Sequence, residues 1–364
     1  MISFIVGRGM GHMGRCISIM KCLSEKDQCL QVHAFPETHD YLKNNLPQEC
    51  KLKEYQTGNI LEAAKDRVLI HDWRPEVAES TGGSHNRIGP VTVSLYHSRF
   101  DMKKNEPKPM RDFKRHIRQV ANKTDVFLHI NVTPPRKKLS DMECLYIPIP
   151  NITRDATQSP KEVKAKLGLK EGEPFILVQM GSGLGKHRYK QIKKWYRQVD
   201  KLAYKYQFVV AGQLKDEDFP FSKKVIQAPL FPNGKDLVQA ADLVITKPGM
   251  GILGDCISTQ TPILMLPADN PERKQKIQIL RRILKSDIGI VKKPDELEKK
   301  IEKAMANKEI FEKSFKAIPA NGAEVAAKIM MKLMEIPRTE LKKRKKELLS
   351  LTPFYFHAKK KECQ

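Results

Sequence analysis

The sequence predicts an α/β protein with two Rossmann-like domains, each a doubly wound parallel sheet, that face one cleft. The first observation is length, because 364 residues are enough for about two domains. The second is that short apolar runs alternate with helical segments along the chain, which is the rhythm of βαβ units. The third is a glycine-rich turn after an early apolar run in each half, where parallel sheets commonly bind ligands.

The first domain is expected over residues 1–150. Its strands are predicted from five apolar runs, at residues 2–6, 30–34, 68–70, 91–95 and 126–130. The stretch 147–153 contains Pro148 and Pro150 and leads through polar residues to Pro160. Proline at this density is typical of a connection, so we expect a linker there.

A second domain is expected over residues 160–335. Its strands are predicted from six further apolar runs, at residues 175–179, 208–211, 225–228, 243–246, 263–266 and 288–291. The composition changes after Ile336 and Pro337. Residues 336–364 are therefore expected to form a basic C-terminal helix or tail.

The chain is strongly basic, with 66 Lys and Arg against 42 Asp and Glu and a net charge of +24. Its hydrophobic content of 40% excludes general disorder. The basic residues are densest at 99–118 and at 336–364, and three aromatic residues at 354–356 lie in the second segment. Such charge attracts nucleic acid or an anionic membrane surface, although a solvated surface is the simpler interpretation.

The seven cysteines include no CxxC pair, which argues against a zinc ribbon or a disulfide framework. A reducing cytoplasm suits such a chain. The N-terminus has no basic segment followed by a cleavage site, so no signal peptide is expected. No apolar run approaches the roughly 20 residues that span a bilayer, and any membrane contact is expected to be peripheral.

The first glycine-rich turn is the run GRGMGHMGR at residues 7–15. Glycines between a strand and a helix let a ligand approach the backbone, and the helix N-terminus favours negative charge. The dinucleotide fingerprint fails here because His12 stands where its third glycine is required. An imidazole in this turn can accept a proton from a hydroxyl group, while a local backbone cap is the alternative role for His12.

The second glycine-rich turn is the run GSGLGKHR at residues 181–188. A P-loop would need glycine at position 180 and serine or threonine at 187, where the chain has Met180 and His187. The turn can still hold a phosphate, and an ordinary strand-to-helix turn is the alternative. The candidate phosphate-binding residues are Gly181, Ser182, Gly183 and Lys186.

Residues 241–275 carry the most informative pattern. A predicted strand runs into Lys247 and a glycine-rich helix start, the helix carries Asp255, and the next strand ends in a polar loop. Backbone N–H groups at the helix start would bind a diphosphate, and the carboxylate would accept both ribose hydroxyls. The candidate residues for a nucleotide sugar are Lys247, Gly249, Met250, Gly251, Asp255, Asn270 and Gln275.

These motifs resemble those of GT-B glycosyltransferases, in particular the MurG-like and related nucleotide-sugar-dependent families, and the architecture is similar over roughly residues 1–335. The run at 7–15 looks like the family's N-terminal glycine loop, whose histidine corresponds to His12. The stretches 70–75 and 94–97 are similar to cleft-facing segments of related transferases. The family places a ribose-binding acid eight residues after a basic residue, as Asp255 follows Lys247, although Glu and Arg or His are its usual residues.

The resemblance implies sugar transfer from a nucleoside diphosphate, with UDP as the first choice, to a hydroxyl acceptor. It implies inversion without a metal ion, and no cofactor, because the nucleotide sugar is a substrate. His12 would be the base with Asp72 in reserve, and the acceptor side would include Gly9, Gly11, Arg15 and His97. The spacing Asp216-Glu217-Asp218 matches a metal-binding motif of another transferase fold and is interpreted here as solvated surface.

The expected partners are the nucleotide sugar and an acceptor that includes polyprenyl or other lipids at an anionic membrane surface. A nucleotide-sugar hydrolase or 2-epimerase on the same fold is an alternative. A nucleic-acid-binding protein or nucleic-acid-modifying transferase that uses the basic tail is another. The pattern makes no prediction of oligomeric state.

Overall fold

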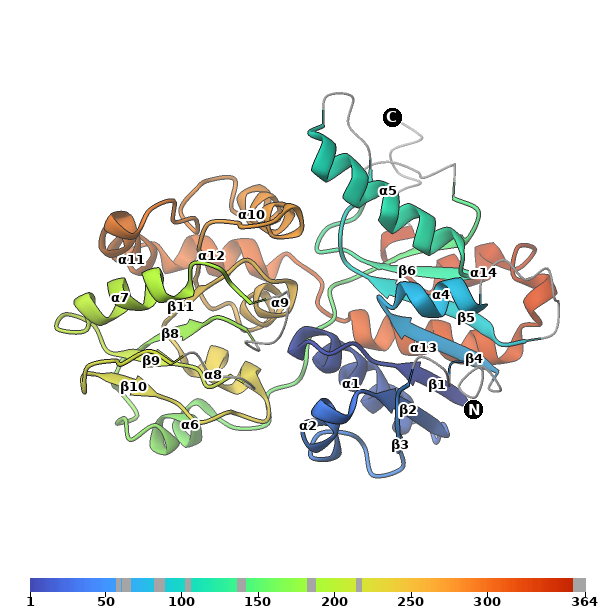
Figure 1. Ribbon diagram of the computed structural model, residues 1–364, viewed down its shortest axis with the longest axis horizontal. Coiled ribbons are helices and arrows are strands. Elements are labelled where there is room, and N and C mark those ends of the chain that lie inside the picture. Colours follow the sequence, from blue (N-terminus) through green and yellow to red (C-terminus); the bar gives the residue numbers. More distant parts are fainter. Residues whose placement is uncertain are drawn as a thin grey trace. The chain divides into compact units, whose positions relative to one another are not determined.

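The computed structural model describes residues 1–56, 60, 67–81, 89–101, 106–135, 142–181, 188–213 and 218–355. The chain divides into two compact units, whose helices and strands are labelled in Figure 1. Unit 1 contains Met1–Arg8, His12–Thr153 and Pro319–Gln364, and unit 2 contains Arg154–Ile318 together with Gly9–Gly11.

Unit 1 is built on a seven-stranded sheet in the order β3-β2-β1-β4-β5-β6-β7. All neighbouring strands are parallel. The strands are β1 (Ile2–Ile5), β2 (Leu30–Ala34), β3 (Lys51–Glu54), β4 (Val68–Asp72), β5 (Val91–Tyr96), β6 (Val126–Ile130) and β7 (Leu145–Ile149). The strand order reverses between β1 and β4, which is where doubly wound sheets bind ligands at their carboxyl edge.

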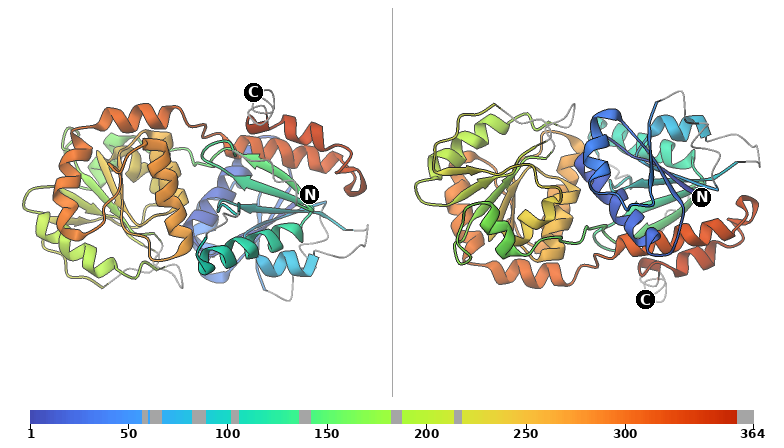
Figure 2. Two further views of the ribbon diagram at one scale, coloured as in Figure 1. Left: turned by 90° about the horizontal axis from the view of Figure 1, so that it is seen from above. Right: turned by 90° about the horizontal axis from the view of Figure 1, so that it is seen from below.

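Helices cover the sheet of unit 1. The helices are α1 (Met10–Ser24), η1 (Pro36–Thr38), α2 (His39–Lys43), α4 (Pro75–Thr81), α5 (Lys108–Asn122), α13 (Gly322–Glu335), η5 (Arg338–Glu340) and α14 (Lys345–Ser350). In Figure 2, α4 and α5 lie on one face of the sheet, and α13 and α14 lie on the other. The central strands are therefore buried on both faces, and their sequences are continuous apolar runs.

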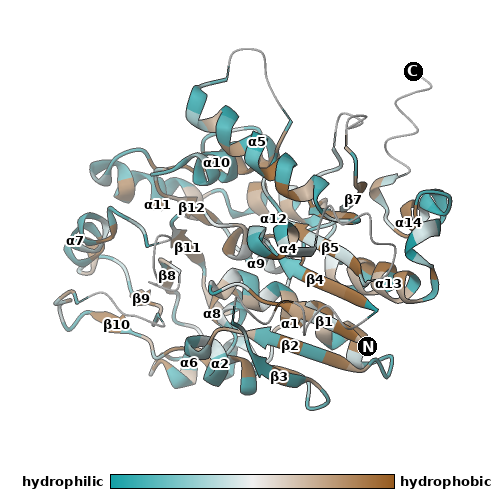
Figure 3. Ribbon diagram, turned by 45° about the vertical axis from the view of Figure 1, so that its right-hand side comes forward, coloured by the Kyte–Doolittle hydropathy of each residue, from teal (hydrophilic) through white to brown (hydrophobic). Residues whose placement is uncertain are grey.

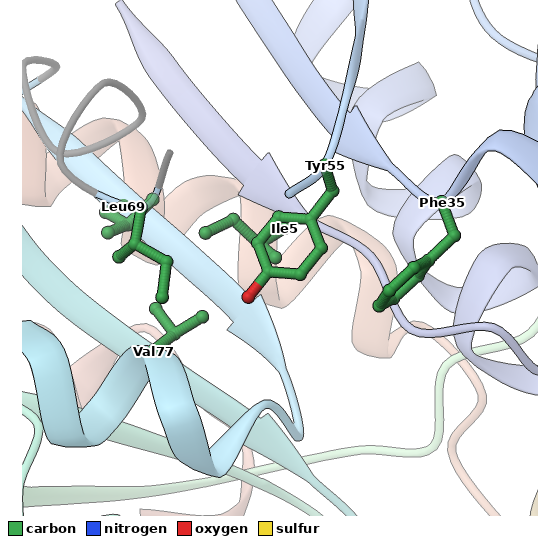
Figure 4. Packing of buried hydrophobic residues seen from close by; sticks show 6 residues of the cluster. Ile5, Phe35, Tyr55, Leu69 and Val77 are labelled. Atoms are coloured by element: carbon green, nitrogen blue, oxygen red, sulfur yellow. The ribbon is translucent and has the colours of Figure 1, made fainter. Parts of the chain in front are cut away.

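A cluster of buried side chains fills the space between this sheet and α4. Ile5, Leu69 and Val77 pack there with Phe35 and Tyr55 (Figure 4). Figure 3 shows hydrophobic residues concentrated on β1 and β4, whereas α5 and the outer helices of unit 2 carry many hydrophilic ones. Burial of this apolar surface is the main stabilising contribution to such a core.

Unit 2 is built on a five-stranded parallel sheet in the order β10-β9-β8-β11-β12. The strands are β8 (Ile176–Gln179), β9 (Phe208–Val210), β10 (Val225–Gln227), β11 (Leu243–Thr246) and β12 (Ile263–Met265). The helices are α6 (Pro160–Lys166), α7 (Ile192–Leu202), α8 (Gly234–Ala240), α9 (Met250–Thr259), α10 (Pro271–Leu284), η4 (Pro294–Glu296), α11 (Leu297–Met305) and α12 (Lys308–Lys316). The predicted fold class, two doubly wound parallel sheets, is confirmed.

Two strand predictions differ from the structure. The expected linker at 147–153 begins inside β7, the edge strand of the first sheet. Pro148 fits there because an edge strand tolerates a residue that has no N–H to donate. The apolar run at 288–291 is not a strand but forms one isolated bridge, between Ile290 and Met265.

The C-terminal boundary also differs from the expected 160–335 domain, because Pro319–Gln364 belongs to unit 1. Helix α13 packs against β4 and β7. The N–H of Gly322 donates to the carbonyl of Asn151 at 3.0 Å, and a Cβ at Gly322 would lie 2.7 Å from that oxygen. Only glycine permits this approach, and the apolar face of α13 completes the core of unit 1.

The basic segment 336–364 is not a free tail over its described part. Helix α14 packs against β7, and the hydroxyl of Thr352 donates to the carbonyl of Pro148 at 2.6 Å. Leu348 and Phe354 are buried. Of the three aromatic residues in the basic segment, Phe354 is therefore part of the core of unit 1, while Phe356 and the last lysines lie outside the described residues. Within the described ranges, no helix has both the length and the apolar character to cross a membrane.

Candidate active site

The end of β4 forms a turn that positions the side chains of residues 71–74, and His71 stabilises this turn. His71 is fully buried, and its Nδ1 accepts a hydrogen bond from the N–H of Arg74 at 3.2 Å. Burial lowers the pKa of His71; Asp72 opposes this effect and the Arg74 charge adds to it, and the resulting pKa is about 3. His71 is therefore neutral at physiological pH, with its proton on Nε2, and it holds the turn through a lone pair on Nδ1.

Asp72 is the centre of a buried charged cluster. Its Oδ1 accepts from Arg15 Nη2 at 2.9 Å and its Oδ2 accepts from Arg15 Nε at 3.1 Å. His12 Nδ1 lies 2.9 Å from Oδ1. Burial raises the pKa of Asp72, but the charges of Arg15 and His12 and their hydrogen bonds lower it overall, so this carboxylate is ionised at neutral pH.

The ionised carboxylate assigns the tautomer of His12. Nδ1 also lies 3.0 Å from Arg15 Nη2, but that nitrogen donates to Asp72 Oδ1 at 2.9 Å. A lone pair on Nδ1 would face the full charge of Asp72, so we place the proton on Nδ1, donating to Asp72, and the lone pair on Nε2. The His12 side chain is 24% exposed, which leaves the ring accessible to a substrate.

The glycines around His12 make room for its ring. A Cβ at Gly7 would lie 3.0 Å from His12 Cγ, a contact tighter than ordinary packing. Gly9 precedes α1 and Gly11 lies in its first turn, and both are half-buried. The loop therefore brings backbone and imidazole together at the carboxyl edge of β1, next to β4.

Three of the predicted site residues are buried, namely Arg15 and His97 on the acceptor side and the reserve base Asp72. Arg15 is 4% exposed and is bonded to Asp72, so it fixes the carboxylate rather than contacting an acceptor. Asp72 itself has no exposed surface and orients His12, so it is not placed to take a proton from a substrate. His97 is also buried, with its ring stacked 4.8 Å from that of Tyr96.

Trp73 lies in the stretch 70–75 that the resemblance placed at the cleft, but no role was predicted for it. It adopts a left-handed backbone conformation, with φ of +52°, and its ring stacks on Tyr96 at 3.9 Å between centroids. A bulky residue in this region of φ costs on the order of 1 kcal/mol. Besides that resemblance, its one sequence signal was its position between Asp72 and Arg74 at the end of a strand.

In unit 2, Lys247 follows β11 and lies against the second glycine turn. Gly181 has φ of +87°, and a Cβ there would lie 2.7 Å from Lys247 Cε and 2.8 Å from Nζ. Burial and, to a smaller extent, the positive charge of Arg273 together lower the pKa of Lys247 to about 8. A nearby anion would therefore stabilise the protonated form of Lys247.

The N-terminus of α9 lies two residues beyond Lys247. Gly249 is the N-cap residue, and no side chain caps the helix. The N–H groups of the first turn, at Met250 and Gly251, therefore have no partner within the helix. Backbone dipole and the Lys247 ammonium both favour a phosphate at this point.

Asp255 is buried in the second turn of α9 and is part of an ion pair that the sequence did not predict. Its Oδ2 accepts from Arg154 Nη2 at 3.1 Å. The carbonyl of Arg154 in turn accepts from Lys235 Nζ, and burial lowers the pKa of Lys235. Arg154 lies in the expected linker, where a basic residue carried no signal.

Asn270 and Gln275 flank a second basic group. The Asn270 side chain accepts from the N–H of Arg273 at 2.8 Å and caps α10, which is a structural role beyond the predicted sugar contact. Gln275 is 3% exposed. Arg273, one turn from the buried Lys276, pairs with Asp269, so basic side chains cluster near the ends of β11 and β12.

Some predicted residues are not described by the structure. Ser182, Gly183 and Lys186 lie outside the described residues, as do Asp216 and Glu217 of the metal-motif spacing. Among the residues that are described, no group of three or more His, Cys, Asp or Glu side chains could hold a metal ion. The six cysteines in the described ranges are all free thiols.

Comparison with known proteins finds no matching family model and no matching curated protein. Solved structures do match. A UDP-glucosyltransferase from Polygonum tinctorium has a TM-score of 0.63 at 10% identity, covering 92% of this chain and 98% of that one. The glycosyltransferase SnogD from Streptomyces nogalater has a TM-score of 0.58 at 14% identity, covering 91% and 99%. MurG from Acinetobacter baumannii has a TM-score of 0.55 at 11% identity, covering 91% and 99%.

Proposed function

We propose that this chain, which has the GT-B fold of those structures, is a glycosyltransferase that moves a sugar from a nucleoside diphosphate to a hydroxyl acceptor. The observation that carries the proposal is the His12–Asp72 pair, in which a buried, ionised carboxylate orients a partly exposed imidazole. The same arrangement activates hydroxyl nucleophiles in other enzymes. UDP is the nucleotide to test first.

Unit 2 would bind the sugar donor. Its diphosphate would lie against the start of α9, where Lys247 and unpaired N–H groups offer positive charge. The ribose would reach Asp255 through the carboxylate oxygen that does not face Arg154. Positive side chains at this position would stabilise the leaving diphosphate, so the mechanism requires no metal ion for that step.

Unit 1 would bind the acceptor and remove its proton. His12 Nε2 takes the proton of the acceptor hydroxyl as its oxygen bonds to the anomeric carbon. The bond between that carbon and the phosphate oxygen breaks, and the nucleoside diphosphate leaves with the electron pair. Attack from the face opposite the leaving group inverts the anomeric centre. Asp72 stabilises the imidazolium that forms, and Arg15 keeps Asp72 ionised and in place.

The exposed basic residues support a finer proposal about location. Lys342, Lys343, Lys345 and Lys346 are all exposed on unit 1, and an anionic lipid surface attracts such a cluster. We propose that they hold the chain at the cytoplasmic face of a membrane, where a lipid-linked hydroxyl acceptor would be available. The charge fits nucleic acid equally well.

The first experiment is a thermal-shift screen with nucleoside diphosphates and their sugars, because a ligand that binds only the folded state raises the midpoint. Turnover is then measured for the parent and for His12→Ala, with His39→Ala as the matched control in the same unit. We expect a loss of about 10²- to 10⁴-fold in His12→Ala and little change in the control. Absence of any ligand-induced shift would refute a nucleotide-sugar enzyme of any kind.

Incubation of the stabilising nucleotide sugar without an acceptor separates the related reactions. A transferase leaves most of the donor intact until a hydroxyl acceptor is added. Rapid release of free sugar would indicate a hydrolase instead, and an isomerised nucleotide sugar would indicate a 2-epimerase. Anomer analysis of the transfer product by NMR tests inversion.

A further inference from the structure

We propose that the exposed face of helix α7 in unit 2 binds a single-stranded nucleic acid. The side chains of this face are basic, and we call it the α7 stripe. Its members are Lys193, Lys194, Arg197 and Lys201, all of them exposed. The inference goes beyond sugar transfer because it names a second class of ligand for the chain. It does not depend on the candidate active site.

Helix α7 separates apolar side chains from basic ones. Its buried residues are Ile192, Trp195, Tyr196, Val199 and Leu202. The stripe residues 193, 197 and 201 recur every four positions, so they follow one another along one side of the helix. Figure 3 shows α7 as largely hydrophilic. A rise of 1.5 Å per residue spaces these cations by about 6 Å, and such a row can track the repeating phosphates of an extended strand.

The acids of α7 do not neutralise the stripe. Residues 188–201 contain six Lys or Arg and one acid, Asp200. Asp200 is half-buried, and its Oδ1 accepts a hydrogen bond from the N–H of Ser222 at 2.7 Å. The only carboxylate of the helix is therefore engaged with the backbone of a neighbouring segment.

The stripe also differs from the basic residue that follows it. Lys205, just beyond the helix, donates to Glu298 and Glu302 of α11 at 2.7 and 2.6 Å. Three stripe residues, by contrast, form no ion pair within the described part of the chain, namely Lys194, Arg197 and Lys201. Cations that are close together and not paired attract an external polyanion most strongly.

An exposed aromatic ring lies beyond the C-terminal end of the stripe. Tyr204 follows Lys201 by three residues and is 68% exposed, the largest value among the exposed large hydrophobic side chains of the described residues. Bases stack on such rings whatever their identity, because every base has a π-face. A row of cations that ends near an exposed ring is the combination that binds single strands without sequence preference.

Acids near the stripe favour a narrow ligand over a flat one. Glu302, which accepts from Lys205, is exposed. Asp218 is also exposed, and the next residue, Phe219, packs its ring 5.6 Å from that of Tyr196 in α7. An anionic membrane pressed on this surface would meet these carboxylates, whereas a strand that follows the stripe would not. A duplex has no unpaired base to offer to Tyr204, so we infer a single strand.

Fluorescence anisotropy with a labelled 15-mer of deoxythymidine tests the stripe directly. In the stripe variant, glutamine replaces Lys194, Arg197 and Lys201. In the matched control, glutamine replaces three exposed lysines of α11 and α12, namely Lys299, Lys303 and Lys313. Each contact to a phosphate of a single strand contributes about 0.7 to the slope of log K against log salt concentration. We expect this slope to fall by about 2 in the stripe variant and to stay unchanged in the control.

Replacing Tyr204 separates stacking from charge. Tyr204→Ser should lower the affinity for the 15-mer at least about fivefold, because it removes the stacked base contact, and should leave the salt slope unchanged. Tyr204→Phe keeps the ring and should bind as the parent does. Neither change should affect binding of a 15-base-pair duplex. Thermal unfolding of each variant confirms that it is folded.

Three results would overturn the proposal. They are no saturable binding of the 15-mer by the parent, an equal loss in the stripe variant and its control, and a loss of retention on phosphatidylserine vesicles in the stripe variant without any loss on the 15-mer. The last result would assign the stripe to a membrane. The thermal shift with nucleotide sugars should be the same in the parent and the stripe variant, so the proposed transferase and the strand-binding surface can each fail alone.

Discussion

At the residue scale, the candidate site is organised by a carboxylate that no substrate can touch. Asp72 is fully buried and accepts hydrogen bonds from Arg15, His12 and, more weakly, the thiol of Cys16 at 3.8 Å. Burial raises the pKa of Cys16 well above its usual range, with Asp72 adding to the effect, so the thiol stays neutral. The charge balance of the pocket therefore depends on Arg15 and Asp72 together.

Replacing Asp72 should damage both activity and stability. Asp72→Asn leaves the Arg15 charge buried without its counter-ion, and breaking such a pair costs about 3 kcal/mol. The same change lets the imidazole adopt the wrong tautomer, so we expect turnover to fall by at least about 10²-fold. Chemical denaturation and initial rates measure the two effects, with the exposed Asp112→Asn as control. Full activity in folded Asp72→Asn would remove the carboxylate from the mechanism.

The lowered pKa of Asp72 also predicts how the free energy of unfolding changes in acid. The pKa of Asp72 in the folded protein is lowered from its ordinary value of 3.8. The ionised carboxylate therefore stabilises the folded protein at pH values above the pKa of the unfolded chain, and this stabilisation is lost as the pH falls toward the pKa of the folded protein. Asp72→Asn lacks this contribution. The stability difference between parent and variant should therefore shrink below pH about 4.

Lys247 gives a second prediction at this scale, through its lowered pKa of about 8. A nucleoside diphosphate binds the protonated form better, so its affinity should fall as pH rises through 8 and the ammonium is lost. The other charged groups that act on Lys247 are Arg273, Asp269 and Glu272. Calorimetric titration over that interval measures the slope.

The matched variants for Lys247 are Arg and Met. Lys247→Arg keeps its charge, so its affinity should stay level to pH 9.5, whereas Lys247→Met should bind weakly at every pH. A slope that persists unchanged in Lys247→Met would assign the titration to another group. The interval begins at pH 7 because the terminal phosphate itself titrates near 6.

At the element scale, the sequence predicted the interior strands well because they are buried on both faces. The apolar runs at 2–6, 68–70 and 126–130 correspond to β1, β4 and β6. The two edge strands of unit 1, β3 and β7, were not predicted, whereas those of unit 2, β10 and β12, match the predicted runs at 225–228 and 263–266. β3 has the sequence KLKE and is largely exposed, and β7 contains a proline. Charged and proline-containing strands are typical of edges, so their patterns resemble loops.

In the candidate site, too, the residues that lie in a local motif were predicted, and the residues that only folding brings together were not. His12, Lys247 and Asp255 were found because each lies in or beside a glycine-rich turn. Arg154 was missed, because it reaches Asp255 across about a hundred residues of chain. Trp73 lay in a predicted cleft-facing stretch but was given no role, because its placement depends on a backbone angle. Neither relation has a local spacing that a pattern could detect.

The N-cap of α10 allows a prediction that separates structure from binding. Asn270→Ala removes the acceptor for the Arg273 N–H and should lower the free energy of unfolding by about 1 kcal/mol. Asn270→Ser restores a capping oxygen and most of that stability. If the amide also contacts the sugar, Asn270→Ser will still lose affinity for the nucleotide sugar but not for the nucleoside diphosphate. If Asn270→Ser binds both ligands as tightly as the parent does, Asn270 is a helix cap and does not contact the sugar.

At the scale of the whole molecule, the net charge of +24 is the property that the two candidate sites leave unexplained. Deleting residues 338–364 would not test it, because Leu341, Leu348 and Phe354 are buried parts of unit 1. Their loss would expose apolar surface and destabilise the unit. Substitution of exposed lysines removes the charge and spares the core.

The test is a four-fold variant that replaces with glutamine the exposed lysines Lys342, Lys343, Lys345 and Lys346. We expect its retention on anionic liposomes to fall by more than about tenfold, because each lysine near such a surface contributes about 1 kcal/mol. The matched control neutralises four exposed lysines of unit 2, at positions 194, 201, 223 and 224. Retention is followed on anionic liposomes, neutral liposomes and duplex DNA across salt concentration.

The four-fold variant and its control distinguish three origins of the charge. Loss on anionic liposomes in the first variant alone assigns segment 342–346 to membrane recruitment, because a local cluster binds a surface more strongly than dispersed charge does. Equal loss on DNA in both variants instead reflects non-specific attraction by net charge, which falls steeply with salt. Retention that is unchanged in both variants on every surface would mean that the lysines serve solubility, and the membrane proposal would fall while the transferase proposal stands.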